Sequence, residues 1–201
     1  LSTNIRKAFQ QYANKCLDKP FVIDEENKAQ WERVLHLFTN NLGVYLKGNP
    51  GSGKTFIMEV LQRITLPSEP NHFIIADAFQ IVKTYNEHYQ YAGDKTLSNW
   101  DAKNICLNEL GLEETGVYQS EVMMKFILFR HRLWVRTGRK THYTTNLTDA
   151  QLDQRYTSAV RRRMYEMSEE IILGGKANST DRSRYRNFKA FPRVTYEAQI
   201  K

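Results

Sequence analysis

The sequence predicts a three-layer α/β domain with a central parallel sheet of about five strands. Short apolar runs alternate along the chain with longer segments of helical periodicity, which is typical of strands joined by crossover helices. The runs are bounded by polar or turn residues, as strands buried on both faces are. A glycine-rich segment follows the first run and opens the next helical segment. In such sheets the crossovers are right-handed, and ligands bind at the carboxyl ends of the strands.

The chain begins with two predicted helices. Apolar residues recur at helical spacing at Ile5, Phe9 and Tyr12, and again at Ala29, Val34, Leu35 and Phe38. A break precedes the second helix, and Asp24 is a candidate for its cap. We divide the chain into an N-terminal helical segment (1–40), a core domain (41–175) and a basic C-terminal tail (176–201).

Strands and helices then alternate. The predicted strands are Gly43–Lys47, His72–Ala76, Asn104–Leu107, Thr141–Thr145 and Glu170–Leu173. The predicted helices are Thr55–Ile64, Ala78–Tyr89, Ser120–Thr137 and Asp149–Glu166. The first of these carries an apolar stripe that is expected to pack on the sheet.

Composition narrows the class of protein. A chain of 201 residues suits one compact domain, and its formal net charge of +7 indicates either a polyanionic partner or a solvated basic surface. Two cysteines, Cys16 and Cys106, make a disulfide framework unlikely, with Cys106 expected in the core. No apolar stretch approaches the roughly 18 residues of a membrane span. We therefore expect a cytoplasmic protein without a membrane segment.

Residues 48–55 match the pattern G-x-x-x-x-G-K-[ST] at every fixed position, between a predicted strand and an amphipathic helix. Glycines let backbone N–H groups close around phosphate oxygens, and the helix dipole favours the anion. The Lys54 ammonium is expected to reach the β- and γ-phosphates, and the Thr55 hydroxyl to hold Mg²⁺. This P-loop predicts a site for ATP and Mg²⁺ formed by Gly48, Asn49, Pro50, Gly51, Ser52, Gly53, Lys54, Thr55 and Phe56.

The third predicted strand, Asn104–Leu107, leads directly into Asn108 and Glu109. P-loop ATPases usually have Asp followed by Asp or Glu here, of which the first holds magnesium and the second polarises the attacking water. Glu109 keeps the carboxylate needed for that catalytic work. Asn108 can bond metal-bound water without adding charge, which predicts weak magnesium binding and weak hydrolysis. Asp77 and Asp101 are alternative acids for the metal site.

Polar residues of two further segments are candidates for the site. Asn146 ends the fourth predicted strand, so it would lie beside the γ-phosphate if this strand neighbours the P-loop strand. Alternatively it caps the next helix, as Thr148 or Asp149 also could. Residues 161–163 are three arginines, which form either a solvated helix face or a site that reaches a neighbouring subunit's nucleotide.

Together these residues resemble the AAA+ family, and within it the DnaC/IstB-like helicase loaders, over roughly residues 21–174. Residues 108–113 resemble the loader Walker B segment, 144–147 the sensor 1 segment, and 156–167 the box that carries the arginine finger. The resemblance assigns catalytic roles to Lys54, Glu109, Asn146 and Arg163, the arginine finger, and a weaker sensor 2 role to Arg182. It also implies that no full C-terminal lid domain follows the sheet.

The resemblance has departures and further implications. Asn108 replaces the usual acid, and Tyr156-Thr157 replaces the usual Tyr/Leu-Gly of the box. Members of this family bind single-stranded DNA as nucleotide-dependent oligomers. Lys83 and Tyr85 would then contact DNA, unless the aromatic residues of this helix belong to the core. The tail also mixes basic and aromatic residues, so it either binds a strand or packs on the domain.

The leading functional hypothesis is a homo-oligomeric ATPase of DNA replication that loads a replicative helicase on single-stranded DNA. The alternative is a transposition helper of the IstB type, a nucleotide-gated DNA-binding adaptor with little turnover that acts with a transposase. In that case Asn108→Asp is expected to raise turnover. A small-molecule kinase is disfavoured because no arginine-bearing lid occurs between the central strands. A GTPase is disfavoured because no Asn-Lys-x-Asp segment occurs.

Overall fold

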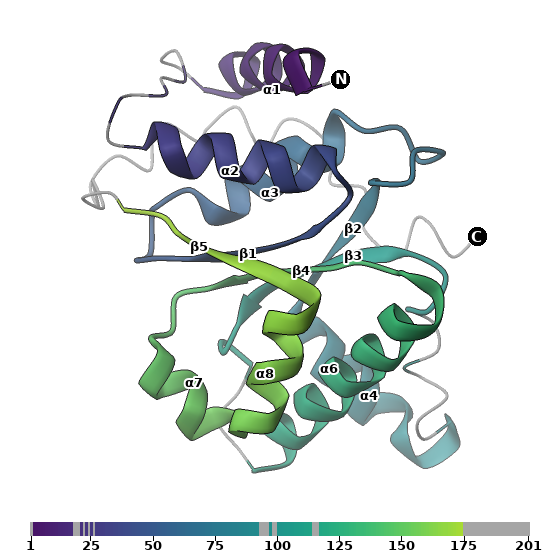
Figure 1. Cartoon of the computed structure of the whole chain (residues 1–201). Helices are drawn as coiled ribbons and strands as arrows, with labels where there is room; N and C mark the ends of the chain where they lie inside the picture. Colours follow the sequence, from purple (N-terminus) through teal and green to yellow (C-terminus); the bar gives the residue numbers. More distant parts are fainter. Residues whose placement is uncertain are drawn as a thin grey trace.

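The computed structural model describes residues 2–17, 21, 23, 25, 27–92, 97, 100–113 and 117–174. These residues form three layers, with a sheet between two sets of helices (Figure 1). In chain order the elements are α1 (Ser2–Cys16), α2 (Lys28–Thr39), β1 (Gly43–Lys47), α3 (Lys54–Arg63), β2 (Phe73–Asp77), α4 (Ala78–Ala92), β3 (Asn104–Leu110), α6 (Val117–Thr137), β4 (Thr141–Thr145), α7 (Asp149–Arg155), α8 (Ser158–Met167) and β5 (Ser168–Ile172).

The sheet has five parallel strands in the order β2-β3-β4-β1-β5. This confirms the predicted α/β class and the predicted parallel sheet. β4 lies between β1 and β3, with Lys47 of β1 opposite Thr145 of β4. The carboxyl ends of β1, β4 and β3 therefore lie side by side, at the edge where parallel sheets bind ligands.

Each face of the sheet has its own core. α1, α2 and α3 cover one face, and α4, α6, α7 and α8 cover the other (Figure 1). Val44 and Leu46 of β1 pack into the first core, whereas Tyr45 between them packs into the second. This alternation buries every residue of β1, as expected for a central strand.

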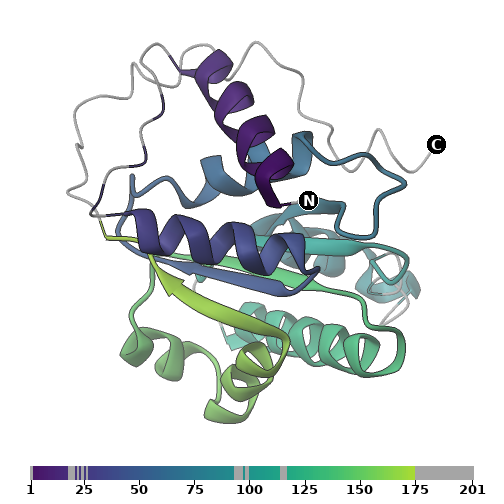
Figure 2. The ribbon, with the colours of Figure 1, turned by 45° about the horizontal axis from the view of Figure 1, so that its top comes forward.

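The two N-terminal helices pack on the rest of the domain rather than apart from it. α2 lies on β1 and β5, and α1 crosses over α2 and α3 (Figure 2). Phe9 of α1 and Trp31 of α2 are buried together, with ring centroids 4.5 Å apart. The described part of residues 1–40 thus shares its core with the P-loop strand.

Most predicted boundaries agree with the observed elements within about three residues. The exception is the helix predicted over Asp149–Glu166, which is wrong because Tyr156 and Thr157 have extended backbones that separate α7 from α8. The Thr157 hydroxyl accepts a hydrogen bond from Val160 N and so caps α8. Asp24 and the whole tail 176–201, including Arg182, lie outside the described residues.

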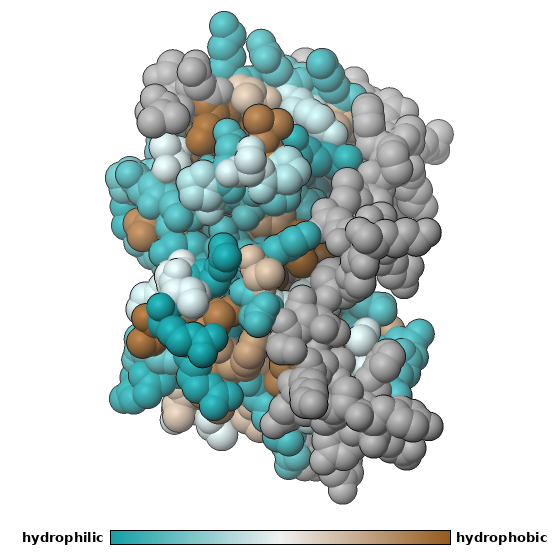
Figure 3. Space-filling model, turned by 90° about the vertical axis from the view of Figure 1, so that its right-hand side faces the viewer, coloured by the Kyte–Doolittle hydropathy of each residue, from teal (hydrophilic) through white to brown (hydrophobic). Residues whose placement is uncertain are grey.

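In the described residues, neither the two cysteines nor the protein surface shows an unusual feature. Cys106 is fully buried, as predicted for a core residue, and Cys16 is also buried and free. Among the described helices, none is long and apolar enough to cross a bilayer. On the side turned to the viewer in Figure 3, hydrophobic atoms are interspersed with hydrophilic ones, an ordinary mixture for a protein surface.

The buried His142 predicts how stability depends on pH. Its ring packs against Phe73, and its Nδ1 accepts a hydrogen bond of 3.1 Å from Val44 N. Burial, helped by nearby Arg130 and Lys140, lowers the pKa of His142 from 6.5 to about 3. The folded state therefore keeps this ring neutral, while the unfolded state takes up a proton below about pH 6.5. The free energy of unfolding is expected to fall by up to about 1.4 kcal/mol per pH unit below that point.

Urea unfolding between about pH 7 and pH 5 measures this effect, with His142→Gln as the control that keeps an acceptor but does not titrate. The wild type should lose more stability than the variant over that range. Parallel pH profiles for the two proteins would contradict the assignment.

Candidate phosphate-binding site

The P-loop is built by glycines that no other residue replaces without strain. A Cβ at Gly48 would lie 2.6 Å from the Leu173 carbonyl oxygen, because the loop leaves β1 directly against the end of β5. Gly53, at the N-cap of α3, has φ of 89°, which places it in the left-handed region. These two positions fold the loop back toward the N-terminus of α3, as the sequence pattern predicts.

The start of α3 presents main-chain donors to this loop. The first helical hydrogen bond joins Ile57 N to Gly53 O at 2.9 Å, so the N–H groups of residues 54–56 lie at the helix N-terminus. This end of the helix is positive and favours an anion. The Phe56 ring is buried against Phe21, so any contribution of Phe56 to the site comes from its main chain.

Lys54 is held inside the loop. Its Nζ donates to Gly48 O at 2.7 Å, Asn49 O at 2.9 Å and Ser52 Oγ at 3.1 Å. All three acceptors are neutral, so the ammonium charge is left to act on an anion in the loop. Burial lowers the pKa of Lys54 from 10.5 to about 8, although the nearby Glu109 carboxylate acts in the opposite direction.

A polar chain links the P-loop to three strands. The Thr55 hydroxyl donates to Asn108 Oδ1 at 3.0 Å, and the Thr144 hydroxyl donates to the same oxygen at 2.7 Å. Asn108 Nδ2 in turn donates to Asp77 Oδ1 at 2.8 Å. Asn108 is only 4% exposed, so its amide orientation is fixed by these partners. The structure thus brings together Thr55, Asn108 and the alternative acid Asp77.

Glu109 projects from an irregularity in β3. The pairing of β3 with β4 shifts between Leu107 and Leu110, and Glu109 has φ of 56°. Its N–H donates to the Thr144 hydroxyl at 2.9 Å, which holds the bulge in place. The side chain of Glu109 is exposed at the carboxyl edge of the sheet. A solvent-accessible carboxylate in this place is suited to orient a water molecule.

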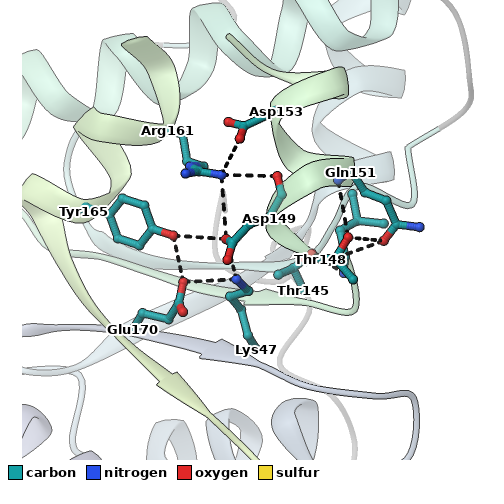
Figure 4. Close-up of polar contacts among 10 residues, drawn as sticks. Lys47, Thr145, Thr148, Asp149, Gln151, Asp153, Arg161, Tyr165 and Glu170 are labelled. Atoms are coloured by element: carbon teal, nitrogen blue, oxygen red, sulfur yellow. Dashed lines mark hydrogen bonds and ion pairs between the residues drawn. The ribbon is translucent and has the colours of Figure 1, made fainter. Parts of the chain in front are cut away.

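The sequence placed Asn146 beside a phosphate on the condition that its strand neighbours the P-loop strand, and the structure meets this condition. β4 neighbours the P-loop strand β1, and half-buried Asn146 follows directly after it. The cap of α7 is Thr148, which forms a capping box with Gln151 (Figure 4). Asn146 is therefore not needed as the cap of that helix. Its contact with a phosphate stays a prediction.

The three arginines of α8 differ in their surroundings. Arg161 contacts Asp149 and Asp153, whereas the Arg162 side chain is 70% exposed. Arg163 Nη1 lies 2.8 Å from Glu166 of the same helix, with its side chain 36% exposed. The role of Arg163 toward a neighbouring subunit stays a prediction.

Sequence reasoning missed a buried lysine next to the P-loop. Lys47, the last residue of β1, is 6% exposed, and its Nζ lies 2.6 Å from Asp149 and 3.2 Å from Glu170 (Figure 4). The Tyr165 hydroxyl lies 2.8 Å from a Glu170 carboxylate oxygen and 3.3 Å from one of Asp149, so its single proton can go to either, and Lys47 lowers the pKa of Asp149. These contacts fix α7, α8 and β5 to the strand that carries the P-loop. No local pattern marks a lysine at a strand end as buried.

A second missed cluster surrounds Glu113. Its carboxylate accepts from Gly111 N at 2.9 Å and from Arg155 Nε at 3.0 Å, and also from the Tyr156 hydroxyl. Glu113 is 2% exposed, so these bonds compensate its burial. They also explain why Tyr156 leaves the helix, since its side chain turns inward to Glu113.

The two residues predicted to contact DNA, Tyr85 and Lys83, have different surroundings in the structure. Tyr85 is 3% exposed within the core, so its ring presents no face on which a base can stack. The prediction of a direct DNA contact for Tyr85 is therefore wrong in this structure. Lys83 is exposed, 3.9 Å from Glu87, and its role stays a prediction.

The side chains that could hold a metal ion at this site offer oxygen atoms as ligands. The described residues contain no cluster of three or more His, Cys, Asp or Glu side chains suited to a metal. Magnesium on a nucleotide needs few protein ligands, because phosphates and water complete its coordination. The Thr55 hydroxyl, the Asn108 carbonyl and the Asp77 carboxylate fit such an ion. Asp101, the other alternative acid, precedes β3 and so lies at the opposite edge of the sheet.

Comparisons with known proteins identify the fold. No protein-family model matches the sequence, and no curated protein matches it. The crystal structure of the DnaC helicase loader has a TM-score of 0.66 at 19% identity, covering 82% of this chain and 99% of that one. DnaI has a TM-score of 0.56 at 18% identity, covering 80% and 87%. AMPPCP-bound DnaA from Aquifex aeolicus has a TM-score of 0.57 at 14% identity, covering 79% of this chain and 50% of that one. The chain therefore has the same fold as the DnaC helicase loader structure.

Proposed function

We propose that this chain is a magnesium-dependent ATPase of DNA replication that acts as a nucleotide-dependent oligomer on single-stranded DNA and loads a replicative helicase. The observation that carries the nucleotide part is the P-loop itself. Its lysine lies among neutral acceptors, and its threonine is tied to the end of β3. This arrangement suits a triphosphate, since the main-chain N–H groups at the start of α3 and the Lys54 ammonium belong to the same loop.

Each residue has a defined task in the proposed reaction. The N–H groups of residues 48–56, apart from Pro50, which has none, and the Lys54 ammonium bind the phosphates. Magnesium, held through Thr55 and Asn108, would neutralise charge on the β- and γ-phosphates. Glu109 orients a water molecule and accepts its proton as the water attacks the γ-phosphorus, and the bond to the β–γ bridging oxygen breaks. Asn146 contacts the γ-phosphate.

The replication role is supported by fold and charge. One structural neighbour is described as a helicase loader, and another as the replication initiator DnaA bound to AMPPCP and single-stranded DNA. A net charge of +7 suits a nucleic-acid partner. On this basis we include in the proposal a helicase partner, the formation of an oligomer and a cytoplasmic location. Arg163 is proposed to reach the nucleotide of a neighbouring subunit.

A second candidate function is a transposition helper that acts with a transposase as a DNA-binding switch with little turnover. The neutral Asn108 favours it, because the usual acid at this position is missing. Phosphate release with and without single-stranded DNA separates the two. A DNA-stimulated rate supports the loader, and no release in either condition supports the switch.

The low pKa of Lys54 predicts how nucleotide binding depends on pH. Without a ligand Lys54 loses its proton near pH 8, whereas a bound phosphate keeps it charged. The affinity for ADP should therefore be steady near pH 7 and fall above about pH 8, by up to tenfold per pH unit. Calorimetry in EDTA measures this without magnesium. Lys54→Met should show weaker binding without that decline, and equal declines in both proteins would contradict the assignment.

Substitutions of Glu109 and Lys54 should have different effects, the first on hydrolysis and the second on nucleotide binding. Glu109→Gln keeps size and polarity but cannot accept a proton, so hydrolysis should fall about 100-fold or more while analogue binding is retained. Lys54→Ala should weaken nucleotide binding itself, as Lys54→Met does. Phosphate release and calorimetry with a non-hydrolysable ATP analogue measure the two effects. A Glu109→Gln protein that hydrolyses ATP at the wild-type rate would remove Glu109 from the proposed mechanism.

Arg163 should matter only between subunits. Arg163→Ala removes only a partly exposed ion pair with Glu166, which contributes little to stability, so the fold should persist. ATP-dependent self-association, followed by sedimentation with single-stranded DNA present, should be lost while ATP binding remains. Arg162→Ala is the matched control and should associate normally. If Arg162→Ala loses association and Arg163→Ala does not, the arginine has been assigned incorrectly.

A further inference from the structure

The neutral Asn108 raises the question of which residue supplies negative charge at the magnesium site. β2 ends at Asp77, and the β2–β3 register places Asp77 directly opposite Asn108. Asp77 is half-buried at the carboxyl edge of the sheet, and its Oδ1 accepts the hydrogen bond from Asn108 Nδ2 at 2.8 Å. The carboxylate thus lies two hydrogen bonds away from the Thr55 hydroxyl.

The amide of Asn108 fits this position because it accepts and donates at once. Its oxygen accepts from the hydroxyls of Thr55 and Thr144, while its NH₂ group donates to Asp77. An ionised Asp at position 108 could accept both hydroxyl bonds but could not donate to Asp77. It would also place two carboxylates within hydrogen-bond distance, where like charges repel.

We propose that Asp77 supplies the carboxylate of the magnesium site, with Asn108 as a neutral bridge that orients Asp77 and Thr55. The charge that other P-loop ATPases carry on β3 is thereby moved one strand outward, to β2. This inference rests on the proposed function, since it concerns magnesium bound with a nucleotide in the same P-loop. Glu109 remains the residue that orients water.

The inference changes the expectation for Asn108→Asp. From the sequence alone, this substitution restores a missing acid and should raise turnover if the protein is the adaptor of the IstB type. In the structure it adds a second negative charge beside Asp77 and removes the donor that holds Asp77 in place. The single substitution should therefore weaken the magnesium site, and the combined exchange Asp77→Asn/Asn108→Asp should restore one acid and one amide in contact.

The test measures how much magnesium strengthens binding of a non-hydrolysable ATP analogue, by calorimetry in Mg²⁺ and in EDTA. Asp77→Asn should lower the Mg²⁺-dependent gain in affinity by about tenfold, because one nearby charge is lost. Binding of ADP in EDTA should be unchanged, which shows that the P-loop is intact. The exchange of both residues should recover most of the gain that Asp77→Asn loses, whereas Asn108→Asp alone should have a smaller gain than the wild type.

Asp101→Asn is the matched control and should behave as wild type, because Asp101 lies at the opposite edge of the sheet. Thermal unfolding of each variant checks the fold. If Asp77→Asn keeps the full magnesium gain, or if the double exchange fails to recover it, Asp77 is not the acid of the site. If the wild type binds neither ADP nor the analogue, the proposed function itself fails.

Discussion

The site depends on one hydrogen bond, between the Thr55 hydroxyl and the Asn108 amide oxygen. It ties the first turn of α3, which carries the P-loop lysine, to the end of β3, which carries Glu109. Because Asn108 also bonds to Thr144 and Asp77, three strands and one helix meet at a single buried amide. Removing that amide would leave several partners unsatisfied in a poorly solvated place, so its effect is expected to exceed that of one lost bond.

Much of the fold follows from local patterns in the sequence. β1 and β4 begin and end where predicted, and the helix after β1 carries the expected apolar face. The P-loop was predictable because its chemistry is contained in eight consecutive residues, 48–55, and its glycines have local steric reasons. Asn108 and Glu109 were identified because they end a buried strand. Such signals need no knowledge of distant contacts.

What sequence reasoning missed depends on contacts between distant residues. Lys47 is buried only because Asp149 and Glu170 meet it from other elements, about 100 residues further along the chain. The break between α7 and α8 arises because Tyr156 bonds to Glu113. Tyr85 has an aromatic ring that could stack on a base, yet α4 directs this ring into the core. Asp77 becomes a partner of Asn108 only once the β2–β3 register is known.

The central claim is that residues 48–56 enclose the phosphates of a nucleotide. Hydrogen–deuterium exchange of the backbone amides, with and without Mg·ATP, tests it most directly, since these N–H groups are the proposed ligands. The account predicts slower exchange on nucleotide addition at the N–H groups of residues 48–56 other than Pro50, and a smaller effect at the ends of β3 and β4. Unchanged exchange across 48–56 at saturating nucleotide would contradict it.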